Sequence, residues 1–286
     1  MSNVVASKLV FGTVSLGLAY GLPRVGASAV APLDDEAVSE LVEHALARGI
    51  AVFDTAPAYG TSEVRLGRAL RGRGRVWTKV AGGDPGVSLE RSLRHLERDR
   101  VELLQWHNWT DALGHDPGWR AAWMALRDDP RVAKLGATTY GAADAVAAAR
   151  SGLFDVVQVE YNLLNQGVVA ALEPEDRAID VAVRSVYLQG ALTDDGRALP
   201  ELPTLREGLA RAREVAGEAG LTRLALASAV EHPRITHVLL GFDRVEQIDL
   251  AIEAVGRSHP ACRTERAVSL DLRGDPAADP RTWPVR

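Results

Sequence analysis

The sequence contains a single cysteine, Cys262, among its 286 residues. One cysteine cannot form an internal disulfide, and scarce cysteine is typical of proteins in a reducing compartment. The chain starts without a basic segment followed by an apolar stretch, so we expect no signal peptide. No uncharged run approaches the ~20 residues that a membrane-spanning helix needs. These absences predict a cytoplasmic protein that does not enter a membrane.

An excess of basic residues is also missing, because 33 Lys and Arg stand against 38 Asp and Glu, a net charge of −5. This balance argues against a nucleic-acid surface. The seven histidines show no metal-ligand spacing, so we expect no metal site. No Gly-x-Gly-x-x-Gly follows a strand-like run, and the Arg- and Gly-rich segment 65–75 lacks the Lys-Ser/Thr ending of a phosphate-binding loop. We interpret that segment as a solvated helix end.

The composition is that of a folded protein, with 47% hydrophobic and 25% charged residues. The length suits one (β/α)8 barrel of ~250 residues. No linker or composition shift divides the chain. We therefore predict one domain over residues 1–286, with 257–286 as a coil-like C-terminal tail.

Short β-rich runs alternate with longer amphipathic segments along the chain. The strand-like runs are 9–13, 51–54, 76–79, 101–106, 132–137, 156–159, 181–186 and 236–240. The helix-like segments are 34–48, 61–71, 88–98, 117–128, 141–151, 166–176, 204–231 and 244–256. Eight strand–helix units predict the α/β class and a closed parallel TIM barrel. Pro174 should keep the sixth helix short, whereas Asp34 and the Thr61-Ser62 pair are plausible N-caps.

Polar side chains end three neighbouring strand-like runs. Asp54, Lys79 and His107 stand at these ends, and Tyr59 follows five residues after Asp54. In a TIM barrel the ends of the strands form one mouth, where the chemistry takes place. A phenol, an ammonium, a carboxylate and an imidazole together can donate and retrieve a proton near neutral pH. The sequence therefore predicts an enzyme.

The sequence motifs around these residues resemble those of the aldo-keto reductases, and of bacterial members in particular. The resemblance rests on Phe-Gly-Thr-Val at 11–14, Phe-Asp-Thr-Ala-Pro-Ala-Tyr-Gly at 53–60 and Trp-Thr-Lys-Val at 77–80, and it covers roughly residues 7–256. It implies an NADPH-dependent reductase that interconverts an aldehyde or ketone with its alcohol by hydride transfer. Tyr59 would be the general acid and base, Lys79 would activate it, Asp54 would hold Lys79, and His107 would orient the substrate oxygen.

The same resemblance implies a set of cofactor contacts: Gly12, Thr13, Thr138, Gln158, Gln189, Gly190, Gly241, Arg244 and Gln247. Arg244 would contact the 2′-phosphate of NADPH, the predicted cofactor, with NADH as the alternative. Asp243 adds an adjacent negative charge, and Leu250 and Ala251 stand where adenine-binding Glu and Asn are common in the family.

The substrate is predicted to be a small carbonyl or sugar-like molecule held by Tyr20, Asn108 and Trp109, with Trp106 or the tail residue Trp283 as further candidates. A short loop at 81–88 and a short tail suggest an open mouth. We expect a monomer or a weak homo-oligomer. Two alternatives stay open: a cofactor-binding regulatory protein without turnover, and an NAD-dependent sugar (aldose) dehydrogenase, which Asp243 would favour.

Overall fold

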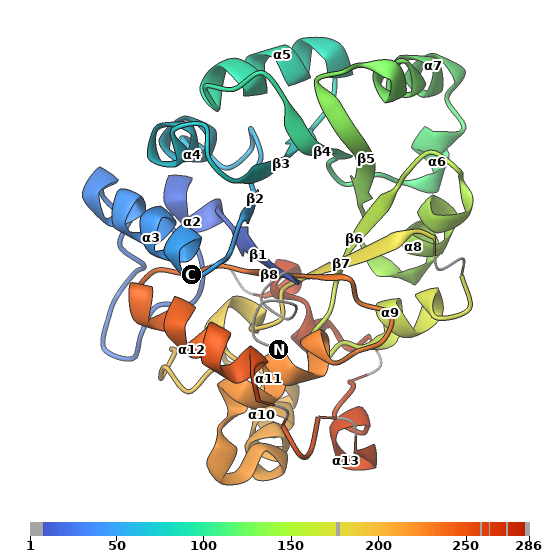
Figure 1. Ribbon diagram of the computed structural model, residues 1–286. Helices are drawn as coiled ribbons and strands as arrows, with labels where there is room; N and C mark the ends of the chain where they lie inside the picture. The colour runs from blue at the N-terminus through green and yellow to red at the C-terminus, as the bar shows by residue number, and fades with distance from the viewer. Residues whose placement is uncertain (1–7, 176–177, 258, 263, 273, 284–286) are drawn as a thin grey trace.

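Eight parallel strands form a closed barrel in a computed structural model that describes residues 8–175, 178–257, 259–262, 264–272 and 274–283. Each strand pairs with the next, and β8 returns to β1, so the ring in Figure 1 has no open edge. The strands are β1 (Leu9–Gly12), β2 (Val52–Asp54), β3 (Arg75–Val80), β4 (Val101–Trp106), β5 (Val132–Thr138), β6 (Val156–Glu160), β7 (Asp180–Arg184) and β8 (His237–Leu240). The predicted TIM barrel is confirmed.

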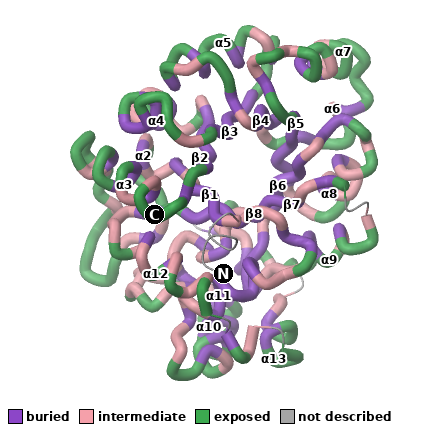
Figure 2. The backbone as a smooth tube through the Cα atoms, in the orientation of Figure 1, coloured by how far each residue is buried: buried purple, intermediate pink, exposed green. Residues whose placement is uncertain are grey.

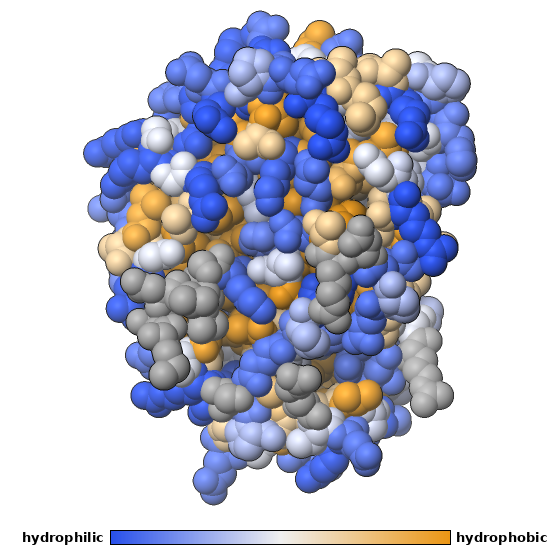
Figure 3. All heavy atoms as spheres, turned by 45° about the vertical axis from the view of Figure 1, so that its right-hand side comes forward, coloured by the Kyte–Doolittle hydropathy of each residue, from blue (hydrophilic) through white to orange (hydrophobic). Residues whose placement is uncertain are grey.

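Helices surround this ring. They are α2 (Val14–Gly17), α3 (Asp35–Ala47), α4 (Ser62–Leu70), α5 (Pro85–His95), α6 (Asp111–Gly114), α7 (Pro117–Ala125), α8 (Gly141–Arg150), α9 (Gly167–Leu172), α10 (Pro203–Ala216), α11 (Leu221–Val230), α12 (Val245–Val255) and α13 (Glu265–Val268). Their outward faces are exposed while the strands are buried (Figure 2). Hydrophilic side chains cover most of the face shown in Figure 3. Among the described residues, no helix is both long enough and apolar enough to cross a bilayer.

The structure corrects two of the helix predictions and confirms a third. Helix α5 begins three residues before the predicted start, because Asp84 accepts a hydrogen bond from the Val87 amide (2.9 Å) and Pro85 opens the helix. The segment 204–231 holds two helices, since Gly217 and Gly220 take positive φ values between them. Helix α9 ends before Pro174, as predicted.

The predicted caps give one confirmation and one correction. Asp34 accepts a hydrogen bond from the Ala37 amide (2.8 Å), so it caps α3 as predicted. Thr61 makes no side-chain cap on α4. Ser62 is fully buried, and its hydroxyl lies 2.8 Å from that of Thr13 and 3.0 Å from that of Thr55. Ser62 therefore ties α4 to the ends of β1 and β2 instead of capping a helix.

The interior of the barrel changes from apolar to polar along the strands. Seven strands each contribute one side chain to a buried apolar cluster: Val10, Val52, Trp77, Leu103, Val156, Ala182 and Leu239. Side chains two residues apart on a strand point to the same face. Four buried polar residues stand two positions after members of this cluster, namely Asp54, Lys79, Gln105 and Gln158. The apolar cluster thus supports a polar layer at the carboxyl ends of the strands.

The tail was predicted as coil, and its described part contains α13 and 3-10 turns at Pro276–Ala278 and Pro280–Thr282. It packs on α10 and α11 through an apolar cluster that includes Trp283. The indole nitrogen of Trp283 donates to the carbonyl of Ala277 (3.0 Å), and this side chain lines neither of the two cavities described below. Its expected place at the substrate was wrong, because it anchors the tail.

Candidate active site

A buried ion pair lies at the centre of the polar layer. The Lys79 ammonium donates to Asp54 Oδ2 (2.6 Å) and to the Thr55 carbonyl (2.8 Å), and the Lys79 and Asp54 side chains are only 1% and 3% exposed. The other Asp54 oxygen accepts from the amides of Gln105 (2.8 Å) and Gln158 (3.1 Å). The carboxylate is therefore held on both sides, and the position of the ammonium is fixed with it.

Electrostatics keep this ammonium charged. Burial alone lowers the pKa of Lys79, since it penalises the charged form, but the Asp54 carboxylate acts in the opposite direction and the net pKa is raised. Lys79 is thus a fixed positive charge in a nearly dry environment. Charges in such a place act strongly on groups beside them.

Tyr59 and His107 stand beside that charge. The Lys79 ammonium lies 4.8 Å from the centre of the Tyr59 ring, and the His107 ring meets Tyr59 edge-on at 6.1 Å. Burial, and then the positive charge of Lys79, lowers the pKa of His107 to about 4. His107 is therefore neutral near pH 7 and can donate one N–H. The structure brings the four predicted catalytic side chains together.

The position of Tyr59 depends on a close approach that sequence reasoning missed. A Cβ placed on Gly17 of α2 would come within 1.9 Å of the Tyr59 carbonyl oxygen and 2.5 Å of the Ser62 nitrogen. Gly60, at φ +60°, lies against the carbonyl of Gly17. Only glycine at position 17 lets α2 pack this tightly on the Tyr59 loop. Local sequence patterns do not predict a contact between positions so far apart in the chain.

Two cavities meet at Tyr59. The larger, about 550 Å³, runs from Asp54 and Tyr59 to the start of α12, and the smaller is about 270 Å³. Among the predicted cofactor residues, those that line the larger cavity are Gly12, Thr13, Gln158, Gln189, Gly190, Gly241 and Gln247. Thr138 lines the smaller cavity, and Arg244 lines neither. We call the larger cavity the groove.

The segment 185–197 forms one side of the groove with an unusual backbone. Ser185, Leu188 and Gln189 all have positive φ values, between 47° and 65°. Strained conformations of this kind cluster at functional sites. The segment is held to the loop 21–27 by backbone hydrogen bonds, such as that from Val25 N to Gly196 O (2.9 Å). Part of the groove is therefore lined by a segment that the loop 21–27 holds in place.

Gln158 has one group available for a ligand in this groove. Both of its N–H groups are donated, to Asp54 and to Gln105 (3.0 Å), so its carbonyl oxygen is the atom that can accept from a bound amide. The groove volume is also within the range of cavities that hold cofactors. The residues present therefore fit a nicotinamide dinucleotide.

Several ionisable side chains line the smaller cavity. Tyr59, Lys79 and His107 are among them, and so are Tyr140, Arg184 and Arg281. Both guanidinium groups stack on the Tyr140 ring, at 4.4 Å for Arg184 and 3.6 Å for Arg281. Sequence reasoning missed these three residues. Arg184 ends β7, so the rule that found Asp54 and Lys79 could have found it as well.

Two residues that were predicted to contact the substrate, Trp109 and Asn108, do not line either cavity. Trp109 is 1% exposed and packs edge-on against Phe154 (5.4 Å), because its backbone N–H binds the Thr138 carbonyl and turns the ring away from the mouth. Asn108 is exposed and lines neither cavity. Trp106 packs edge-on with Trp119 and Trp123 and is also absent from both linings. Tyr20 lines both cavities.

Comparison with known proteins agrees with this geometry. The model of the aldo/keto reductase family matches residues 8–259. An aldo-keto reductase of Mycolicibacterium smegmatis is 32% identical over 173 residues, covering 55% of this chain and 60% of that protein. The aldo-keto reductase YhdN of Bacillus subtilis is 24% identical over 198 residues, covering 62% and 60%. The chain thus spans about 60% of the length of these curated relatives.

A solved structure shares the fold. The aldo-keto reductase from Bacillus halodurans, in its holo form, superimposes with a TM-score of 0.76 at 22% identity, over 92% of each chain.

Proposed function

Because the chain belongs to the aldo/keto reductase family, we propose that it reduces an aldehyde or ketone to the alcohol with a nicotinamide cofactor, and that Tyr59 supplies the proton. One observation carries this proposal: the buried Lys79–Asp54 ion pair lies against the Tyr59 ring where the two cavities meet. The same groups catalyse the oxidation of the alcohol when the reaction runs in reverse.

Each side chain has a role that follows from its charge and position. When bound, the reduced nicotinamide supplies the two electrons and the hydrogen that reach the carbonyl carbon. The Tyr59 hydroxyl donates its proton to the carbonyl oxygen, on which negative charge develops. The positive charge of Lys79 stabilises the negative charge left on the Tyr59 oxygen, and Asp54 keeps Lys79 in place.

His107 orients the substrate. Its pKa of about 4 makes the ring neutral near pH 7, so it offers an N–H to the carbonyl oxygen without adding a second positive charge beside Lys79. One such donor is typically worth ~3–4 kcal/mol of the activation barrier. His107 lines the smaller cavity, which we assign to the substrate, together with Tyr20 and Arg184.

The groove is assigned to the cofactor. Gln158 would accept from the nicotinamide amide, and the backbone around Gly190 and Gly241 lets a ligand approach closely. The sequence expectation of NADPH depends on Arg244. The choice between NADPH and NADH is decided by the charges at the far end of the groove.

Replacement of Tyr59 tests the proposal. Tyr59→Phe keeps the ring and removes the hydroxyl, so reduction of a carbonyl panel should fall by ~10²–10⁴-fold. Cofactor affinity, measured by fluorescence titration, should stay within a few-fold of the wild-type value, because the groove is unchanged. Turnover that persists in this variant would remove Tyr59 as the proton donor.

A further inference from the structure

The groove is lined by two separate sets of residues, which suits the two halves of a dinucleotide. Asp54 and Tyr59 line one end, while Asp243, Gln247 and Leu250 line the other, at the start of α12. This inference depends on the proposed function: if the nicotinamide lies at Tyr59, the adenosine half lies near α12. The side chains at that far end then contact the adenosine ribose.

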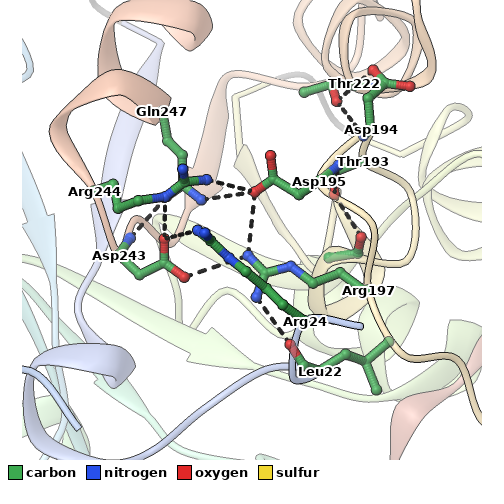
Figure 4. Close-up of polar contacts among 11 residues, drawn as sticks. Leu22, Arg24, Thr193, Asp194, Asp195, Arg197, Thr222, Asp243, Arg244 and Gln247 are labelled. Atoms are coloured by element: carbon green, nitrogen blue, oxygen red, sulfur yellow. Dashed lines mark hydrogen bonds and ion pairs between the residues drawn. The ribbon is translucent and has the colours of Figure 1, made fainter. Parts of the chain in front are cut away.

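Those side chains form a cluster of carboxylates and arginines, shown in Figure 4. The acid–arginine cluster comprises Arg24, Asp195, Arg197, Asp243, Arg244 and Gln247. It joins three loops: the one before α3, the segment after β7 and the turn between β8 and α12. Asp195, Arg197, Asp243 and Gln247 of this cluster line the groove itself.

The arginines in this cluster are already paired. Arg244 Nη2 donates to Asp195 Oδ2 (3.1 Å), and Arg197 Nη2 lies 3.4 Å from a carboxylate oxygen of both Asp195 and Asp243. Arg24 lies 3.9 Å from Asp243. Gln247 also donates to Asp195 (3.1 Å). The one cation that sequence comparison assigned to a 2′-phosphate is therefore held by a carboxylate.

Asp195 is a charged carboxylate near neutral pH. Burial tends to raise its pKa, but the hydrogen bond from Gln247 and the charges of Arg244 and Arg197 bring the pKa below its usual value. Asp243 lies next to Arg244 and presents a second carboxylate to the groove. An entering ligand thus meets two acceptors of hydrogen bonds.

A 2′-phosphate and a 2′-hydroxyl would interact differently with the acid–arginine cluster. The three arginines outnumber the two aspartates, and Arg223 and Arg257 also line the groove, so this region does not repel anions as a whole. A phosphate, however, must draw a guanidinium away from Asp195 or Asp243 and leave a carboxylate beside a dianion, which is unfavourable. A ribose hydroxyl needs no such rearrangement, because it donates directly to a carboxylate, and in NAD-binding folds an acidic residue accepts this hydrogen bond.

We propose that Asp195 and Asp243 select a cofactor whose adenosine ribose carries a free 2′-hydroxyl, so that this protein uses NADH in preference to NADPH. The selection works chiefly against the competitor, because its phosphate must compete with Asp195 and Asp243 for the arginines that they bind. This reverses the sequence expectation of NADPH, which took account of Asp243 beside Arg244 but not of Asp195.

Titration of both nucleotides tests this selection. Dissociation constants for NADH and NADPH are measured by fluorescence on the wild type and on Tyr59→Phe, which removes turnover from the readout. We expect NADH to bind at least about tenfold more tightly. Asp195→Asn and Asp243→Asn each keep the shape of the side chain and remove one negative charge. Each should therefore tighten NADPH binding and bring the dissociation constants of NADPH and NADH closer together.

A matched control is an aspartate on α12, close to the cluster in the chain. Asp249 on α12 pairs with His44 and Arg48 and does not line the groove, so Asp249→Asn should leave the ratio unchanged. Thermal melts show that each variant is folded. If the wild type binds NADPH as tightly as NADH, the proposed selection is wrong. It is also wrong if Asp195→Asn and Asp243→Asn both leave the ratio of the two dissociation constants unchanged. Failure of both nucleotides to bind overturns the proposed function instead.

Discussion

Two pairs of an acidic and a basic residue lie beside the groove, one near its inner end and one near its outer end, in opposite settings. At the inner end, Asp54 and Lys79 are 3% and 1% exposed and belong to strands β2 and β3. At the outer end, Asp195 and Arg244 are 27% and 40% exposed and belong to loops. Buried charges from rigid elements suit chemistry that needs a fixed position. Half-exposed charges from loops suit the selection of a ligand.

The energetic consequences differ as well. Removing one partner of a buried pair leaves an uncompensated charge and typically costs 3–5 kcal/mol, whereas an exposed pair contributes about 0–1 kcal/mol. On the proposed function, the inner pair should govern both folding stability and turnover. The outer cluster should govern the choice of nucleotide and little else.

The largest effect is expected from Lys79→Met. It leaves Asp54 charged and unpaired, so the free energy of unfolding should fall by about 3–5 kcal/mol in a denaturant titration. Asp195→Asn, at the outer end, should change it by less than about 1 kcal/mol. Similar losses at the two ends would contradict the comparison.

The double variant Asp54→Asn with Lys79→Met separates stability from chemistry. Without either charge, most of the lost stability should return, because no buried charge stays unpaired. Turnover should not return, since the phenol of Tyr59 still lacks its cation. Recovered turnover would show that Lys79 has only a structural role.

A smaller effect is expected from Gly17→Ala, which acts on Tyr59 through the backbone. The added Cβ would meet the Tyr59 carbonyl at 1.9 Å, so the loop must shift, with a loss of stability of about 1–3 kcal/mol. A displacement of about 1 Å can reduce kcat about 10²-fold. Gly167→Ala is the control, because a Cβ there meets nothing within 4 Å. Equal kcat values in the two variants would refute this positioning role.

A pH dependence of stability is also expected, and it arises from His107. Its pKa is about 4 in the folded protein and near 6.5 when unfolded, so the unfolded chain binds the proton first as the pH falls. The stabilisation is complete above pH 6.5 and is lost progressively toward pH 4, by no more than about 3 kcal/mol. Unfolding titrations of the wild type and His107→Gln across this range should show a shallower slope in the variant. Parallel slopes would mean that His107 is not buried as a neutral ring.

The features that could be predicted from the sequence are those that strand ends define. Asp54, Lys79 and His107 each follow an apolar run, and a closed barrel brings such ends to one mouth. Local patterns also located the eight strands. They could not show that Trp109 turns away from the mouth, because that depends on a backbone hydrogen bond to Thr138.

Contacts between distant loops could not be predicted either, because local sequence patterns do not contain them. Arg281 belongs to the tail, which Trp283 anchors against α10 and α11, and this anchoring brings Arg281 to the smaller cavity. Asp195 and Arg244 lie 49 positions apart, so no local pattern predicts that one neutralises the other. The sequence identified an arginine suited to a phosphate, and the fold supplied its carboxylate partner.

Transfer of a label tests the central claim most directly. A nicotinamide cofactor that carries deuterium at the reactive C4 position is incubated with a carbonyl panel, and the alcohol products are examined by mass spectrometry. We predict deuterium on the alcohol carbon with the wild type and none with Tyr59→Phe. Tight cofactor binding by the wild type with no deuterium in any alcohol would contradict the account.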